Sequence, residues 1–406
     1  MLRFGALLWA ARTLGPSRFG AIGIGLGLAG FLLALNAGLA LFGTRAIAAD
    51  PDRPQALVGR LVGARLAIAA VLYGATAIAV TAIVQSQQQR IVLLVYALVV
   101  FTDAATLRWA YVGLQETGGV AIAGSLAAAL YLAAVVLFVR GADDLAFVPL
   151  AHVAGEALIA VALILLARQR LRGWRPAIDW RLWVEGLRES ASMTVTKASR
   201  SVLLTVDTLM VSVLISSIAA GNYAAPQRLT IVAMLFVGLL YETSLPAFVT
   251  TFQRSTDAGV RLVWATTRHV AMIVVPGAII AGLLARPLIN LAIGHAYDES
   301  IGLLRVLVWG VALSTLAGPF ITALWALGAD RLVATVTVVA AASNIALNLA
   351  LLPTVGVMGA AIADALAKGL LFGLVVATLH RRVRAGRAQD DTADPIDLAG
   401  IPMGDE

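Results

Sequence analysis

Long apolar segments separated by short polar stretches recur from one end of the chain to the other. Five of them precede residue 168 and six follow residue 186. Their approximate bounds are 19–41, 60–84, 90–111, 118–139 and 145–167, then 187–216, 222–251, 262–285, 301–327, 331–352 and 357–379. A helix needs roughly 20 apolar residues to cross a bilayer, and every segment reaches that length. The pattern predicts an all-α, polytopic bundle of transmembrane helices.

The first apolar run is shorter than the others. It starts at Leu2 and is broken by Gly15-Pro16, which leaves too few residues for a helix that spans a bilayer. We expect it to be the second half of a first span, so that each half of the chain contributes six helices. A start codon assigned too far downstream explains such a truncated first helix, and a genuine truncation or a shortened, inactive relative is the alternative.

Two pairs of similar sequences, each pair about 200 residues apart, indicate an internal repeat. "RLVGARLAIAAVLYGATAIAV" from Arg60 resembles "RLVWATTRHVAMIVVPGAIIAGL" from Arg261, and "GPSRFGA" matches "AAGNYAA". Parallel repeats of this kind place a substrate cavity between two pseudo-symmetric lobes, near the middle of the membrane. We predict four parts of the chain: an N-terminal lobe over 1–167, a basic cytoplasmic connecting loop over 168–186, a C-terminal lobe over 187–380 and a polar, disordered cytoplasmic tail over 381–406.

Composition excludes a soluble protein. Hydrophobic residues make up 60% of the 406 positions and charged residues only 13%, against about 25% charged residues in soluble domains. The chain has no cysteine, so disulfides, zinc-thiolate sites and cysteine nucleophiles are excluded.

The net charge of +7 comes from arginines that gather in alternate connections between the apolar segments, around 45–60, 168–181, 254–261, 331 and 381–387. Loops that carry Arg and Lys face the cytoplasm, which places the C-terminus there. We expect the membrane to be the plasma (inner) membrane. This distribution argues against a nucleic-acid partner.

Three motif matches do not indicate catalysis or metal binding. "GLGLAG" at Gly25 to Gly30 fits a dinucleotide fingerprint, but it lies in an apolar segment with no βαβ context. Its small residues are better explained by close approach of neighbouring helices. Ser192 and Lys197 loosely resemble a Ser-Lys hydrolase pair without a supporting motif, and the four histidines are too scattered to predict a metal site.

Charged residues inside the apolar segments carry more information, because an ionisable group in a span usually faces a cavity or a partner. Lys197, Arg200 and Asp207 lie within roughly 80° of one another on one helix face. Two cations so placed can bind a phosphate or pyrophosphate through charge-assisted hydrogen bonds. The alternative is a structural ion-pair network, with Arg200 bonded to Asp207 or to an acid of another span.

Acidic residues in the spans are candidates for coupling to an H⁺ or Na⁺ gradient, and no other cofactor is expected. We assign this possible role to Asp103, Glu156, Asp207 and Glu242. Asp364 and Lys368 are four residues apart and are predicted to pair with each other. His152 and Glu156 have the same spacing and are candidates for a proton relay.

Four stretches resemble the membrane proteins of polysaccharide biosynthesis, of the O-antigen flippase type in the multidrug, oligosaccharidyl-lipid and polysaccharide exporter superfamily. "ARTLGPSRFGAIGIGLGLAG" is similar to the signature that closes their first span, and "GTRAIAADP" to the loop after their second. "DTLMVSVLISSIAAGNYAAPQRL" is similar to their seventh span and the turn after it, and "SNIALNLALLPTVGVMGAAIADALA" to their eleventh and twelfth.

The resemblance implies a two-lobed bundle of twelve to fourteen spans that flips polyprenyl-pyrophosphate-linked oligosaccharide by alternating access, not an enzyme. Arg12 falls in the family signature, and we therefore add it to Lys197 and Arg200 as a substrate-binding candidate. The implied partners are the lipid-linked oligosaccharide, membrane lipids, and possible polymerase and glycosyltransferase enzymes. The alternatives are an ion-coupled drug or small-molecule antiporter of the same superfamily, a membrane enzyme, for which no loop is long enough, and an envelope scaffold.

Overall fold

The computed structural model describes residues 2–50, 54–170 and 175–392, apart from the side chains at 142, 168–170, 232–243 and 386–392. This part of the chain is helical and contains no β-strand. In the first half, the helices are α1 (Leu2–Ala49), α2 (Pro54–Ile83), α3 (Gln87–Ala97), α4 (Val99–Ala105), α5 (Arg108–Gly113), α6 (Thr117–Phe138), the short η1 (Ala142–Ala146) and α7 (Phe147–Arg170). In the second half they are α8 (Trp180–Leu214), α9 (Ser217–Arg254), α10 (Thr256–Leu283), α11 (Ala285–Ala292), η2 (His295–Tyr297), α12 (Ser300–Ala326), α13 (Asp330–Val355) and α14 (Val357–Thr392).

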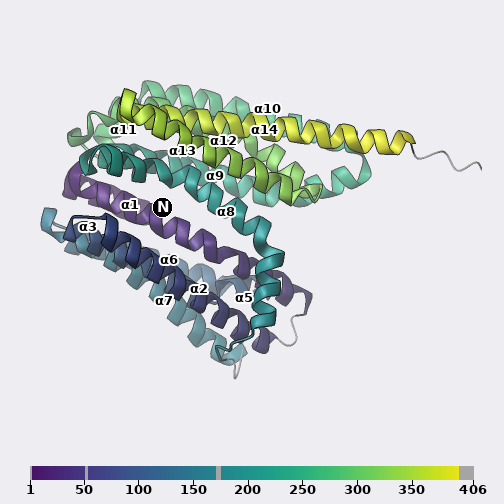
Figure 1. Cartoon of the computed structure of the whole chain (residues 1–406), viewed down its shortest axis with the longest axis horizontal. Helices are drawn as coiled ribbons and strands as arrows, with labels where there is room; N and C mark the ends of the chain where they lie inside the picture. Colours follow the sequence, from purple (N-terminus) through teal and green to yellow (C-terminus); the bar gives the residue numbers. More distant parts are fainter. Residues whose placement is uncertain (1, 51–53, 171–174, 393–406) are drawn as a thin grey trace, which may run out of the picture.

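The helices form two groups with α1 between them (Figure 1). Helices α2 to α7 lie on one side and α9 to α14 on the other, while α1 has its most extensive contacts with α8 and α9. The matched pair from Arg60 and Arg261 falls in α2 and α10, and the pair "GPSRFGA" and "AAGNYAA" falls in α1 and at the start of α9. The predicted all-α bundle of two lobes is therefore confirmed.

α1 is two helices joined by a sharp reversal at Gly15, whose φ of 72° and ψ of 172° are not helical. A positive φ costs glycine nothing, so Gly15 permits the turn that Pro16 then follows. Near the reversal, Trp9 donates to the carbonyl of Val139 at the end of α6, at 3.0 Å. Arg3 pairs with Glu156 well inside α7, so residues 2–14 run back alongside the bundle. The predicted half-length first helix is thus a packed part of the N-terminal lobe.

Small residues of α1 allow the helices of the second half to approach closely. A Cβ added at Gly20 would lie 2.2 Å from the carbonyl oxygen of Ser217, and one at Gly27 would lie 3.0 Å from the Cβ of Thr205. On the facing helix, a Cβ at Gly221 would lie 1.8 Å from the carbonyl oxygen of Pro16. Helices in membranes associate through such small-residue contacts, as expected for the "GLGLAG" stretch.

The connection between the halves is shorter than the loop predicted over 168–186. α7 continues to Arg170 and α8 begins at Trp180, with Asp179 as its N-cap accepting from the amide of Leu182. The segment before α8 packs on the start of α2, where Ala177 donates to the carbonyl of Gly59 at 3.0 Å. The tryptophans and arginines of this stretch led to the prediction of a loop as far as residue 186. α8 instead begins at Trp180, because Asp179 caps its first turn and the preceding segment packs on α2.

The C-terminal tail was predicted to be disordered from residue 381. α14 instead continues through Thr392, so the first part of that tail is helical. Residues 393–406 lie outside the described part of the chain.

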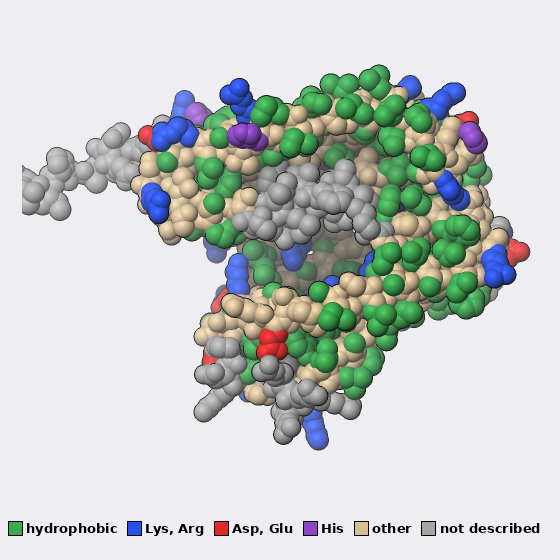
Figure 2. Space-filling view, turned by 180° about the vertical axis from the view of Figure 1, so that it is seen from behind, with side chains coloured by type: hydrophobic (Ala, Val, Ile, Leu, Met, Phe, Trp, Pro, Cys, Tyr) green, Lys and Arg blue, Asp and Glu red, His purple; other side chains and the backbone are tan. Residues whose placement is uncertain are grey.

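The chain is a multi-pass membrane protein. Among the described residues, nine helical segments are long and apolar enough to cross a membrane. Large apolar side chains on their outer faces are exposed, such as Ile78, Ile122, Ile273 and Leu349. Figure 2 shows this apolar outer surface over much of the molecule. Such a surface is stable in lipid and not in water.

Gly221→Ala tests the tight contact between α9 and α1. The added methyl group must displace the backbone at Pro16, and such overpacking costs about 1–3 kcal/mol of folding free energy. We expect a lower thermal unfolding midpoint for the purified protein in detergent. Gly74→Ala in α2 is the control, because its Cβ would meet nothing within 4 Å. Equal midpoints for the two variants would contradict the close packing described here.

Candidate functional site

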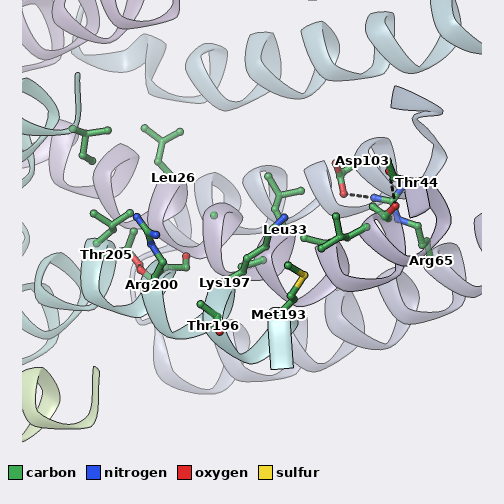
Figure 3. A pocket seen from close by; sticks show the side chains of 18 of the residues that line it. Leu26, Leu33, Thr44, Arg65, Asp103, Met193, Thr196, Lys197, Arg200 and Thr205 are labelled. Atoms are coloured by element: carbon green, nitrogen blue, oxygen red, sulfur yellow. Dashed lines mark hydrogen bonds and ion pairs between the residues drawn. The ribbon is translucent and has the colours of Figure 1, made fainter. Parts of the chain in front are cut away.

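A cavity of about 810 Å³ lies between the two lobes. Its walls come mainly from α1 and α8, with two residues of α9 and single residues of α2, α4, α12 and α13. Figure 2 shows the molecule hollowed between its two halves, with basic side chains inside, and Figure 3 shows the lining side chains from close by. The volume is within the range typical of small-molecule sites.

The cavity wall follows helical periodicity on both main helices. α8 contributes Met193, Thr196, Lys197, Arg200, Ser201, Leu204 and Thr205, and α1 contributes Leu26, Gly30, Leu33, Ala34, Ala37, Ala40, Leu41 and Thr44. Steps of three and four residues place each set on one face of its helix. Since the α1 face is made largely of small and aliphatic residues, it leaves space opposite the longer polar side chains of α8.

Positive charge predominates in the lining. Four cationic side chains, Arg65, Lys197, Arg200 and Arg228, face two acidic ones, Asp103 and Asp330. The structure thus brings together two of the three predicted substrate-binding residues, Lys197 and Arg200, on neighbouring turns of α8 (Figure 3). Low-dielectric walls around an excess of one charge strengthen its attraction for a ligand of opposite charge.

Arg65 of α2 is a cavity residue that the sequence analysis missed. Its side chain is only 1% exposed, and its Nη2 pairs with Oδ2 of Asp103 at 2.6 Å. Figure 3 shows this pair at one end of the cavity. Asp103 was assigned a possible coupling role, and the structure gives it a structural partner that stabilises its charge. An arginine inside the apolar run from Arg60 was the available signal.

Arg228 of α9 is the second missed residue, and it lies deeper in the bundle. It was not among the predicted site residues, although it falls inside the span predicted over 222–251. Its Nη2 donates to the carbonyl of Gly23 at 3.2 Å, where the missing side chain of that glycine gives access to the α1 backbone. The Arg228 Nε–H has no hydrogen-bond partner among the described residues. A buried donor of this kind is available to water or to a ligand in the cavity.

The cavity reaches one end of the bundle. Thr44 lies near the end of α1, and Trp325 and Asp330 flank the turn between α12 and α13. At the opposite limit, Leu26 and Arg228 lie about ten residues into their helices from the other end of the bundle. With a rise of about 1.5 Å per residue, the cavity extends from that end to near the middle of the bundle.

Arg12, the third predicted substrate-binding residue, does not line this cavity. It is exposed near the Gly15 reversal, and its Nε donates to the carbonyl of Ala292 at the end of α11, at 2.9 Å. The structure does not bring Arg12 together with the other two cations, because the reversal at Gly15 places it at the far end of the bundle. Its hydrogen bond joins the first helix to the second lobe.

Glu156 of α7 lies in an ion-pair network of the N-terminal lobe. One carboxylate oxygen pairs with Arg3, and the other lies 3.6 Å from Nη2 of Arg108. His152, one turn earlier, packs its ring against Tyr96 and Tyr131, with centroid distances of 5.7 and 5.6 Å. No hydrogen bond between His152 and Glu156 occurs among the described residues, so their predicted relay stays a prediction.

Asp207 lies on the expected face of α8 but not in the cavity. It is fully buried and accepts a hydrogen bond from Asn348 of α13 at 2.6 Å. At the next residue, Thr208 donates to Gln227 of α9 at 3.1 Å. α9 and α13 thus enclose this part of α8, whereas the turns at Lys197 and Arg200 face the open space between the lobes. The three residues do not form a single site, since one helix face meets different neighbours along its length.

A polar cluster surrounds Asp207 in the C-terminal lobe. Lys368 Nζ lies 2.6 Å from Oδ1 of Asp364, which confirms the predicted pair, and both side chains are buried. Asp207 interacts electrostatically with both of them, and Asn344 lies beside Asn348. The side chain of Glu242, the fourth acidic candidate, lies outside the described residues. Among those residues, no group of three or more His, Cys, Asp or Glu is arranged to hold a metal ion.

Comparison with known families identifies the chain. The family model described as "Polysaccharide biosynthesis protein" matches residues 1–252. The chain belongs to the polysaccharide biosynthesis protein family. The match covers the N-terminal lobe, α8 and nearly all of α9, which are the elements that supply most of the cavity wall. None of the curated protein sequences compared with the chain matches it.

Solved structures show the fold of this family member. A multidrug resistance MATE-family transporter of the MOP superfamily, in an inward-facing conformation, has a TM-score of 0.80 at 13% identity and 95% coverage of both chains. An outward-facing MATE-family structure of that superfamily has a TM-score of 0.60 at 15% identity, covering 95% of this chain and 92% of that one. The lipid II flippase MurJ, in an inward closed conformation, has a TM-score of 0.67 at 13% identity, covering 93% and 86%. The chain therefore has the fold of MOP-superfamily transporters.

Lys368→Met tests the buried cluster of this polysaccharide biosynthesis protein. Removing the ammonium leaves Asp364 beside Asp207 without its counter-ion, and breaking a buried pair in this way costs about 3–5 kcal/mol. We expect a much lower thermal unfolding midpoint in detergent. The double variant Lys368→Met/Asp364→Asn removes both charges and should recover much of the loss. A double variant that unfolds at a still lower temperature than Lys368→Met, by the separate cost of the second substitution, would show that the two side chains do not stabilise each other.

Proposed function

We propose that the protein is a flippase that moves polyprenyl-pyrophosphate-linked oligosaccharide across the plasma membrane for cell-surface polysaccharide synthesis. The observation that carries the proposal is the cavity between the lobes, with four cationic side chains against two acidic ones. The family, described by its role in polysaccharide biosynthesis, and the resemblance to the lipid II flippase support the same class of substrate.

The charges of the cavity fit a pyrophosphate group. Lys197 and Arg200 of α8 and Arg228 of α9 line the cavity and are placed to meet an anionic ligand, and Arg65 adds its charge at one end, where it pairs with Asp103. Arginine and lysine bind phosphate oxygens through charge-assisted hydrogen bonds, which are stronger in surroundings of low dielectric constant. Ser201 and Thr196 on the same wall add hydroxyl groups suited to a sugar or a phosphate oxygen.

Alternating access is the mechanism that this geometry supports. The cavity reaches one end of the bundle, and the similarity is greater to the inward-facing transporter than to the outward-facing one. The arginine-rich connections are on that same side, which we assign to the cytoplasm together with the C-terminus. A rocking motion of the lobes about the fixed cationic site would then expose the substrate to the outer leaflet.

Coupling to an H⁺ or Na⁺ gradient is part of the proposal, with Asp207 as the acidic residue in question. Asp103 and Glu156 each have an arginine partner, whereas the Oδ2 atom of Asp207 has no hydrogen-bond partner among the described residues. Polymerase and glycosyltransferase enzymes are the proposed functional partners, because they would consume and supply the lipid-linked sugar. The alternative function, a drug or small-molecule antiporter, would depend on such acids and not on the cavity cations.

Arg200→Ala is the principal test. Loss of one charge-assisted hydrogen bond is worth about 1.5–3 kcal/mol, so the translocation rate of lipid-linked oligosaccharide should fall roughly tenfold to a hundredfold. Translocation is measured in proteoliposomes as accessibility of the glycan to a soluble lectin. Arg200→Lys should retain more activity than Arg200→Ala because it keeps the charge.

Arg12→Ala is the matched control for that test. Arg12 bonds to a backbone carbonyl far from the cavity, so its loss should leave translocation near the wild-type rate. Full translocation activity of correctly inserted Arg200→Ala would contradict the proposal that the cationic cavity binds the substrate. Drug export that survives in Arg200→Ala and fails in Asp207→Asn would favour the antiporter.

The proposed orientation has a separate test, which the absence of cysteine from the chain makes simple. Thr44→Cys at the cavity mouth should react with a membrane-impermeant maleimide only from the cytoplasmic side. Asp143→Cys should react only from the opposite side, because Asp143 lies at the other end of the bundle with its side chain 98% exposed. The readout is labelling in right-side-out and inverted vesicles. The reverse pattern would show that the cavity opens outward.

A further inference from the structure

The first turns of α8 carry an exposed apolar stripe at the end of the bundle where the cavity opens. Trp180, Val184 and Leu187 are 70%, 61% and 44% exposed. Steps of four and three residues place these side chains within about 60° of one another on the helix. Figure 1 shows this part of α8 reaching across to the first lobe at that end of the bundle. In a membrane protein, an unpartnered apolar stripe in this position faces lipid.

Contacts with the first lobe fix the start of α8. The segment before the helix lies on α2, where a Cβ added at Gly63 would be 2.3 Å from the carbonyl oxygen of Ala177. Trp183 is only 6% exposed, and its Nε1 donates to the carbonyl of Arg60 at 2.9 Å. The ring of Trp180 packs against that of Trp183, with a centroid distance of 4.8 Å. An exposed tryptophan held in this way is typical of the level of the lipid headgroups.

Two arginines border the apolar stripe. Arg181 and Arg188 are seven residues apart, so they lie within about 20° of each other on the helix and roughly 10 Å apart along it. Both are exposed, and neither forms an ion pair within the part of the chain that the structure describes. Glu185 and Glu189 lie further round the helix, away from the stripe. Cations beside the apolar side chains and acids beyond them form the pattern of a helix at an anionic membrane surface.

This basic surface is separate from the cationic cavity. Neither Arg181 nor Arg188 lines the cavity, and Lys197, the first cation of the cavity wall on α8, comes nine residues after Arg188. Asp179, the acid that caps α8, pairs with Arg60 of α2 at 3.2 Å and not with the arginines of its own helix. The charges of Arg181 and Arg188 are therefore directed to the surroundings of the bundle.

We propose that the start of α8 is a binding surface for anionic phospholipids of the cytoplasmic leaflet. The apolar stripe enters the boundary of the acyl chains, and the two arginines bind headgroup phosphates through charge-assisted hydrogen bonds. The negative surface potential of that leaflet attracts basic residues next to a membrane span. The ligand is a lipid of the bilayer and not the transported cargo, so the proposal does not depend on the proposed function.

The test measures which lipid lies next to the stripe. Ala191→Cys places a single cysteine on exposed α8 surface one turn beyond Arg188, and a fluorophore is attached to it. The full chain is reconstituted in phosphatidylcholine liposomes that contain nitroxide-labelled phosphatidylglycerol or nitroxide-labelled phosphatidylcholine. Quenching should show a preference for phosphatidylglycerol of roughly tenfold to thirtyfold, because each arginine near the surface contributes to the attraction. In Arg181→Gln/Arg188→Gln the two lipids should quench almost equally.

Two controls separate this surface from a general attraction for anionic lipid. Ile122→Cys carries the fluorophore on α6, a helix without charged residues, at a position that is 73% exposed. Both lipids should quench it equally. Arg254→Gln removes an exposed arginine at the end of α9, where residues 244–254 include no large exposed apolar side chain. It should leave the preference measured at Ala191→Cys unchanged.

Three results would overturn the proposal. The first is equal quenching by the two lipids at Ala191→Cys, which would leave the basic surface to an acidic protein partner. The second is a preference that survives in Arg181→Gln/Arg188→Gln. The third is the same preference at Ile122→Cys as at Ala191→Cys, because the attraction would then belong to the whole protein and not to the start of α8.

Discussion

The packing of α1 against α8 sets the positions of almost everything else in this molecule. The two helices run in opposite directions, with Gly38 beside Thr194 near one end and Gly23 beside Thr208 nearer the other. A side chain at Gly38 would lie 1.8 Å from the Thr194 hydroxyl oxygen, so only glycine permits this spacing. In lipid, where hydrophobic association between helices is weak, close contact of this kind holds the two lobes together. The cavity is lined by the parts of α1 and α8 that lie beside this contact and do not take part in it.

Charged side chains occur in two different surroundings, which differ in the groups that can compensate the charge. In the C-terminal lobe, Asp207, Asp364 and Lys368 are enclosed by other helices, and amide groups or opposite charges surround them. In the cavity, cations exceed acids, which is possible at a modest energetic cost only where water or a ligand reaches them. The excess of positive charge in the cavity therefore supports the proposed anionic substrate, whereas the charges of the enclosed cluster compensate one another within their lobe.

Hydropathy predicted the spans well, because a bilayer imposes one length and one composition on every helix that crosses it. It also predicted Lys197 and Arg200 as neighbours, since their three-residue spacing fixes their direction on α8. It could not place Arg12 or Asp207, whose surroundings depend on the reversal at Gly15 and on the helices that cover α8 beyond Thr205. Arg65 and Arg228 stood out as charges inside apolar segments, but the sequence did not show that they face the cavity. Periodicity gives the face of a helix, whereas tertiary packing determines what that face meets.

α8 is an uninterrupted helix from Trp180 to Leu214. It carries Lys197 and Arg200 in the cavity wall and, two turns further on, the enclosed Asp207. Because a helix without a break moves as one rod, a tilt of α8 that changes the width of the cavity also displaces Asp207 against α13. The cavity wall and the enclosed polar cluster are therefore parts of one mechanical element, although they lie in different surroundings.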